Sequence, residues 1–106
     1  MIGVKNLSPS EFLAGIQNDS DAVLLDVRTP EEYEEKRITG ALNIDIYSPD
    51  FQSEIEKLDH SKNYYIYCRS GSRSFHAGLY MAQQGFKNIY NLDSGIIGWM
   101  YPVERG

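Results

Sequence analysis

Short, largely apolar runs recur along the chain and predict buried strands. They occupy residues 22–27, 41–46, 64–67 and 88–92. The run at 22–27 is apolar at nearly every position, which is typical of a strand that is covered on both faces of a parallel sheet. The pattern therefore predicts four strands of a mostly parallel sheet.

The segments before, between and after these strands carry helix signals. Residues 8–11 and 29–32 each have a Ser or Thr at the N-cap, a proline at the first helical position and a glutamate three residues after the cap. Two later segments have apolar residues at helical spacing: Phe51, Ile55 and Leu58 in the first, and Phe75, Leu79 and Ala82, before Gly85, in the second. Residues 96–99 form a last apolar turn. Strands and helices alternate, which predicts an α/β fold with a mostly parallel central sheet.

The length of 106 residues predicts one domain spanning residues 1–106, because such a chain closes one core and not two. Its apolar runs are far shorter than a membrane span, and its first residues lack the pattern of a signal peptide. The single cysteine cannot form an internal disulfide, which fits a reducing compartment. We therefore expect a cytoplasmic protein without a membrane partner.

The charge balance narrows the classes of ligand. A formal net charge of −5 argues against a nucleic-acid partner, which would need a surface rich in Lys and Arg. Exposed charges more than about 10 Å apart are largely screened at moderate salt, so anion binding must depend on a local cluster. Arg69 and Arg73 form the obvious cluster. His60 and His76 have no metal-ligand spacing with Cys68, so no metal site is expected.

The sequence YYIYCRSGSRS, residues 64–74, places Cys68 at the carboxyl end of a predicted strand. Ligands of open α/β sheets bind at this edge. Gly71 permits a tight turn, and the small residues around it, Ser70, Ser72 and Ser74, let backbone N–H groups point into the loop. Such a loop at a helix N-terminus binds anions. Together with Arg69 and Arg73 it should lower the pKa of the Cys68 thiol.

Less reactive interpretations exist for each of these residues. A lone cysteine at the end of a buried strand is often an inert hydrophobic residue, although two arginines and several serines make a poor apolar environment. His76, inside the following helix, is expected to be a surface residue rather than a general base, since a loop that stabilises a thiolate needs none. The acidic residues 31–35 are expected to form a solvated helix face.

Four segments resemble the motifs of the rhodanese-like domain family, in its small single-domain form. In chain order they are LLDVRTPEEY (24–33), ITGALNI (38–44), YCRSGSRS (67–74) and NLDSGIIGW (91–99). They occur in the right order around the cysteine loop, and the resemblance covers essentially the whole chain. It implies a parallel five-stranded sheet flanked by helices on both faces.

The resemblance also implies sulfane-sulfur transfer through a persulfide on Cys68, without a metal or organic cofactor. By position, the substrate-binding and anion-binding loop consists of Arg69, Ser70, Gly71, Ser72, Arg73 and Ser74. Asp26, Arg28 and the pair of Glu31 and Glu32 would give structural support to a neighbouring turn. The expected partners are a small anionic sulfur donor, such as thiosulfate, a persulfide or polysulfide, and a thiophilic acceptor, such as cyanide or a small-molecule or protein thiol.

The same family includes two other kinds of domain. Cell-cycle phosphatases of this fold have five residues between the cysteine and the arginine of the loop, whereas Cys68 and Arg73 have four between them. The shorter loop favours sulfur over tetrahedral phosphate. The remaining alternative is a non-catalytic rhodanese-like module that binds a protein partner or senses redox state.

Overall fold

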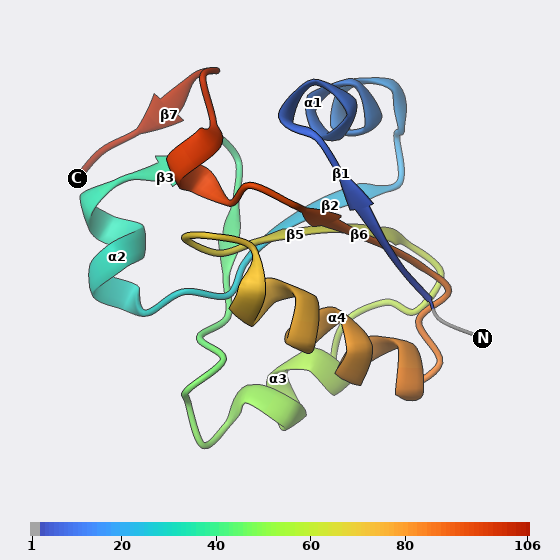
Figure 1. The fold of residues 1–106 in the computed structure, drawn as a ribbon. Helices are drawn as coiled ribbons and strands as arrows, with labels where there is room; N and C mark the ends of the chain where they lie inside the picture. Colours follow the sequence, from blue (N-terminus) through green and yellow to red (C-terminus); the bar gives the residue numbers. More distant parts are fainter. Residues whose placement is uncertain (1–2) are drawn as a thin grey trace.

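The structure, a computed structural model, describes residues 3–106 and has a five-stranded parallel sheet at its centre (Figure 1). The strands, in spatial order, are β1 (Val4–Leu7), β6 (Asn88–Leu92), β5 (Asn63–Tyr67), β2 (Ala22–Asp26) and β4 (Leu42–Asn43). Each neighbouring pair is parallel. The carboxyl ends of all five strands therefore meet at one edge, and the central strand β5 leads directly to Cys68.

Helices cover both faces of this sheet (Figure 1). One face carries α1 (Pro9–Asn18) and the 3₁₀ turn η1 (Ile96–Gly98), and the other carries α3 (Phe51–Glu56) and α4 (Ser72–Gln83). The short helix α2 (Pro30–Glu35) follows β2, and β3 (Arg37–Ile38) pairs antiparallel with β7 (Val103–Glu104). The predicted α/β fold with a parallel five-stranded sheet is thus confirmed. Among residues 3–106, no helix is long and apolar enough to cross a membrane.

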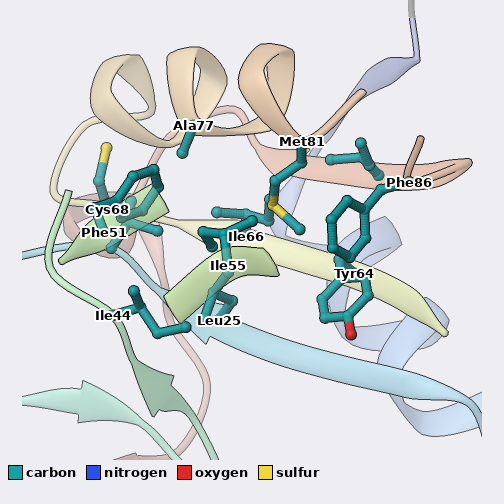
Figure 2. Packing of buried hydrophobic residues seen from close by; sticks show 12 residues of the cluster. Leu25, Ile44, Phe51, Ile55, Tyr64, Ile66, Cys68, Ala77, Met81 and Phe86 are labelled. Atoms are coloured by element: carbon teal, nitrogen blue, oxygen red, sulfur yellow. The ribbon is translucent and has the colours of Figure 1, made fainter. Parts of the chain in front are cut away.

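Two clusters of buried side chains form the core, one on each face of the sheet. Alternate residues of the strands contribute to opposite clusters: Leu25 and Ile66 face α3 and α4, whereas Leu24 and Tyr65 face α1. Figure 2 shows the first cluster, with Cys68 at its end and its sulfur directed toward α4. The thiol therefore lies where the core meets the carboxyl edge of the sheet.

The predicted helix starts are confirmed in atomic detail. Ser8 and Thr29 each accept a hydrogen bond from the backbone N–H of the glutamate three residues later. The carboxylate of that glutamate accepts one from the backbone N–H of the cap residue. Proline occupies the first turn in both helices. These capping boxes fix where α1 and α2 begin because they satisfy backbone donors that a helix leaves unpaired.

Three details of the sequence prediction are wrong. The residue pattern did not show β1, because Val4–Leu7 is a short edge strand with two exposed positions. The strand expected over residues 41–46 is limited to Leu42–Asn43, although the N–H groups of Ile44 and Ile46 still bond to carbonyls at the end of β2.

The third error concerns the face of α4 that packs on the sheet. The expected face, Phe75, Leu79 and Ala82, is only partly buried, and the fully buried positions include Ala77, Gly78 and Met81. Small residues at 77 and 78 allow the helix to approach the sheet closely. A side chain at Gly78 would contact Val4 and Ile89 at 3.0 to 3.3 Å.

Candidate active site

Cys68 is the residue around which the loop after β5 is folded. The thiol is 1% exposed, and the backbone N–H of Gly71 donates to its Sγ at 3.1 Å. The hydroxyl of Ser74, in the first turn of α4, lies 3.3 Å from the same sulfur. The structure therefore brings together Cys68, Gly71 and Ser74 as the sequence predicted, with donors converging on the sulfur.

The loop conformation depends on Gly71. This residue has φ +98°, a left-handed conformation that glycine adopts without strain, and it immediately precedes α4. A Cβ at this position would also collide with the backbone carbonyl of Asp93. The loop thus turns sharply into the helix, which places the N-terminal end of α4 beside the thiol.

The 3₁₀ turn η1 holds the first half of the loop from the outside. The N–H groups of Ile96 and Ile97 donate to the carbonyls of Cys68 and Arg69 at 2.9 and 3.2 Å. Gly95, with φ +68° and ψ −175°, packs its backbone directly against the peptide between Arg69 and Ser70. The carbonyl groups of the loop are therefore bound on its outer side, and its N–H groups remain available to the sulfur.

The surroundings of Cys68 favour its thiolate form. Burial raises the pKa of the thiol, but hydrogen bonds from the Ser74 hydroxyl and from the backbone N–H groups of Ser74, Gly71 and Ser70 outweigh it. The net pKa of Cys68 is lower than that of a free cysteine. The direction agrees with the sequence prediction: hydrogen bonds from the loop and from Ser74 are the largest causes that lower the pKa, and Arg73 also interacts electrostatically with Cys68.

The two arginines of the loop have different environments. Arg69 is exposed and forms no salt bridge within residues 3–106. Arg73 donates to both carboxylate oxygens of Glu32 at 2.8 and 3.0 Å, and its guanidinium lies over the ring of Tyr47. This pairing raises the pKa of Arg73. Arg73 thus connects α4 to α2, and its charge is already matched by a carboxylate.

The Glu32–Arg73 pair predicts a specific pH dependence of stability. The hydrogen bond from Arg73 is the main cause that lowers the pKa of Glu32 from 4.5 to about 2. A carboxyl whose pKa is lower in the folded state stabilises the fold above its unfolded pKa, and this contribution disappears as the pH falls toward the folded value. We expect Glu32→Gln to remove part of the loss of unfolding free energy between pH 4.5 and pH 2.

Chemical denaturation at neutral pH and between these two pKa values measures the effect. Glu31→Gln is the matched control, since Glu31 is exposed on the same helix and forms no salt bridge in the described part of the chain. Identical pH profiles for wild type and Glu32→Gln would contradict the prediction. The Glu32–Arg73 pair also corrects the expectation, drawn from the residue pattern, that residues 31–35 form only a solvated helix face.

Asp26 and Arg28 lie next to the loop but bind chiefly to each other. Nε and Nη2 of Arg28 donate to the Asp26 carboxylate at 2.6 to 3.1 Å, and Nη2 also donates to the carbonyl of Lys36 at 2.6 Å. Both side chains are buried, at 0% and 4% exposure. The pair connects the end of β2 to the residue before β3.

The histidines lie away from the thiol. His76 is exposed on α4, with Nδ1 2.9 Å from the carbonyl of Ser72, and His60 stacks on Phe86. Ser72 is also exposed and makes no hydrogen bond to Cys68 among the described residues. Over residues 3–106, no group of three or more His, Cys, Asp or Glu side chains is arranged to hold a metal.

A pocket of about 240 Å³ opens beside the loop, between α2 and η1. Its walls combine cationic, acidic and aliphatic side chains: Arg28, Glu32, Glu35, Lys36, Arg69, Ile96, Ile97 and Arg105. Lys36, Arg69 and Arg105 form no salt bridge within residues 3–106. The pocket therefore offers cations to an anion close to the loop.

Reasoning from the residues missed three participants. Glu32 was assigned to a solvated face, and its partner Arg73 is 41 positions away. Gly95 has no local pattern that reveals its contact with the loop. Asn91, a polar residue inside a largely apolar strand, carried the one usable signal, since buried polar side chains need specific partners.

The comparison with known proteins supports a family assignment. The Rhodanese-like domain family matches residues 8–101. The chain is 40% identical over 97 residues to a sulfurtransferase of Allochromatium vinosum, covering 91% of this chain and 88% of that protein. It is 36% identical over 103 residues to the thiosulfate sulfurtransferase GlpE of Pseudomonas entomophila, covering 94% and 90%.

A longer relative and a solved structure complete the comparison. The tRNA uridine(34) hydroxylase of Cytophaga hutchinsonii is 37% identical over 105 residues, which are 96% of this chain but only 33% of that protein. A rhodanese-like domain protein from Staphylococcus aureus superposes with a TM-score of 0.82 at 23% identity, covering 96% of this chain and 98% of that one. From the matched residues, the relatives and the fold together, we conclude that this chain belongs to the rhodanese-like domain family.

Proposed function

We propose that this protein is a sulfurtransferase that moves sulfane sulfur from an anionic donor to a thiophilic acceptor through a persulfide on Cys68. The observation that carries the proposal is the convergence of the Gly71 N–H and the Ser74 hydroxyl on a buried Sγ whose pKa is lowered. A thiolate held in this way is the nucleophile that sulfur transfer requires.

The reaction consists of two displacements. In the first, the Cys68 thiolate attacks the outer sulfur of the donor, the S–S or S–sulfonate bond breaks, and the thiolate or sulfite leaves with the electron pair. In the second, an acceptor thiolate or cyanide attacks the terminal sulfur of the persulfide, and the Cys68 thiolate leaves. Charge and atoms balance in each step, so neither a metal nor an organic cofactor is needed.

The loop stabilises the anions of this cycle. Backbone N–H groups of Ser70 and Gly71 face the sulfur, and together with the N-terminal end of α4 they favour a negative charge on Cys68 or on the terminal sulfur of its persulfide. Their position is fixed before the donor binds, because η1 holds the loop carbonyls. The loop needs no proton donor, since neither leaving group is an alkoxide.

The donor is proposed to be thiosulfate, a persulfide or a polysulfide. Cys68 is 1% exposed, so small side-chain shifts at the mouth of the loop must admit the outer sulfur, and a narrow donor needs the least movement. Arg69, Lys36 and Arg105, which form no salt bridge within residues 3–106, give the adjacent pocket positive charge that favours an anionic donor. A reducing compartment such as the cytoplasm would supply the acceptor thiol, either a small molecule or a protein.

Mass spectrometry of the intact protein tests the proposal directly. After incubation with thiosulfate and removal of excess donor, we expect the mass to increase by one sulfur atom, and peptide analysis to place that atom on Cys68. Addition of cyanide or a thiol should then remove it. A protein that acquires no sulfur from thiosulfate, a persulfide or polysulfide is not a sulfurtransferase of this kind.

The second candidate is a non-catalytic rhodanese-like module. A stretch similar to this chain makes up one third of a tRNA uridine(34) hydroxylase, so domains of this family also occur as parts of longer proteins. A module of this kind needs no reactive thiol. The absence of a sulfur adduct, together with a Cys68 pKa equal to that of free cysteine, would favour it over the enzyme.

A further inference from the structure

A buried asparagine lies behind the loop and has no part in the two displacements. Asn91 is on β6 and is 2% exposed. Its Nδ2 donates to the carbonyl of Gly71 at 3.1 Å and to Oδ1 of Asn6 at 2.9 Å. Both amide hydrogens are thereby used, and its Oδ1 accepts from the hydroxyl of Ser74 at 2.5 Å. Asn91 is therefore bound to both ends of the turn that surrounds Cys68.

Ser74 lies between Asn91 and the thiol, and its hydroxyl has one hydrogen to donate. Its Oγ is 2.5 Å from Asn91 Oδ1 and 3.3 Å from Cys68 Sγ, and the side chain is fully buried. In the thiol state the S–H of Cys68 can donate to Ser74, which donates to Asn91. In the thiolate state the hydroxyl donates to the sulfur, and Asn91 Oδ1 loses its donor.

We propose that Asn91 is a positioning residue that competes with the Cys68 thiolate for the hydroxyl hydrogen of Ser74, and thereby favours states in which the negative charge has left Sγ. The part of this inference that concerns the persulfide rests on the proposed function. In the persulfide the charge is on the terminal sulfur, and Sγ is a neutral, weak acceptor. Ser74 then donates again to Asn91, while the loop N–H groups bind the terminal sulfur.

The physical consequence is a bias toward the sulfur-loaded enzyme. A buried acceptor without a donor is unfavourable, and only the unloaded thiolate leaves Asn91 Oδ1 in that condition. Formation of the persulfide restores the hydrogen bond without any transfer of a proton to or from solvent. Asn91 therefore raises the free energy of the unloaded thiolate relative to the persulfide.

Fixed charges also surround the thiol, but they do not change while it ionises. They are Arg69 in the loop, the pair of Arg73 on α4 with Glu32 on α2, and the pair of Arg28 with Asp26 at the end of β2. Arginine and ion-paired carboxylates keep their charges throughout the titration of a thiol. Their effect on Cys68 is therefore constant, whereas the hydrogen bond of Ser74 depends on the state of the sulfur.

Two substitutions at position 91 separate this proposal from a purely structural role. Asn91→Leu removes the acceptor at similar size, so Ser74 is free to donate to the sulfur. The ratio of thiolate to thiol at a fixed pH, measured by the ultraviolet absorbance of the thiolate, should rise about three- to tenfold, the factor that one hydrogen bond supplies. Asn91→Asp retains the acceptor and adds charge, so the ratio should fall.

A purely structural role predicts the same direction for both variants, because both would loosen the loop and weaken its donors. A fall or no change of the ratio in Asn91→Leu would overturn the proposal. The control is to make Asn91→Leu in a protein that already carries Ser74→Ala. Without the hydroxyl of Ser74, Asn91→Leu should have no effect on the ratio of thiolate to thiol.

The wild-type protein provides a readout that needs no variant to fold. The side-chain carbonyl ¹³C resonance of Asn91 should shift with the same midpoint as the thiol, since its oxygen loses a hydrogen bond there. Asn88 is the control, because it lies at the other end of β6 and bonds to Asn63 at 2.8 Å. A resonance of Asn91 that does not follow the thiol would refute the competition.

Loading Cys68 with sulfur from thiosulfate tests the part of the inference that concerns the persulfide. The Asn91 resonance should return to its thiol-state position when Cys68 carries sulfur, and a resonance that stays at the thiolate position would overturn the proposed bias. Failure of the proposed function has a different outcome, because Cys68 would then acquire no sulfur while the titration of Asn91 would still be observed.

Discussion

Sulfur transfer is expected to fall by about 10³-fold or more in Cys68→Ser, since a serine hydroxyl presents almost no anion at neutral pH. The substitution removes the nucleophile but retains a group that can accept from Gly71 and exchange hydrogen bonds with Ser74, which now contact Sγ at 3.1 and 3.3 Å. The fold should therefore be retained.

A thiosulfate–cyanide assay measures the activity, and thermal unfolding followed by circular dichroism provides the control for folding. A midpoint close to that of wild type combined with loss of turnover would assign the chemistry to the thiol. Turnover by Cys68→Ser at the wild-type rate would eliminate the persulfide mechanism, because this chain contains no second cysteine.

The second large effect is expected at Gly95, which lies outside the cysteine loop and precedes η1. Its φ of +68° and ψ of −175° lie in a region that essentially only glycine adopts, and a Cβ there would collide with the peptide between Arg69 and Ser70. Gly95→Ala should therefore destabilise the fold by about 3 kcal/mol, from backbone strain and overlap together. Sulfur transfer should fall by about 10²-fold because the loop amides are displaced from the sulfur.

Gly40→Ala is the matched control for this prediction. Gly40 also has a positive φ, +89°, but a Cβ there would meet no atom within 4 Å. Its replacement should cost only about 1 kcal/mol of left-handed strain and leave turnover unchanged. Equal losses of stability and activity in the two variants, measured by chemical denaturation and the sulfur-transfer assay, would show that contact with the loop is unimportant.

Cys68 and Gly95 differ in how far the local sequence reveals their roles in this site. Cys68 and the loop could be predicted from local pattern, because a glycine, small residues and a strand end restrict the backbone within a few positions. Gly95 acts only through a contact with residues 25 or more positions earlier in the chain. No local sequence pattern encodes such a contact, because it exists only in the folded structure, where η1 packs against the loop.

The charges illustrate the same limit. The sequence placed Arg69 and Arg73 together near the thiol, and the structure separates their environments, with Arg73 bound to Glu32 and Arg69 exposed. Tertiary packing decides which charged residues pair. Glu32 on α2 and Arg73 on α4 are 41 positions apart in the chain, and only the fold brings them together. The direction of the Cys68 pKa was correctly predicted, and hydrogen bonds from Ser74 and the loop are the largest causes that lower it.

By itself, the sequence determined the α/β fold, the two capped helices and the position of Cys68 at the carboxyl edge of the sheet. Each of these follows from interactions between residues close in the chain, such as capping, turn formation and apolar periodicity. Only the tertiary structure decided the partners of Arg73, the support that Gly95 gives to the loop, and the contact of Asn91 with Ser74. These depend on which distant segments pack together, and hydrophobic burial on both faces of the sheet decides that arrangement.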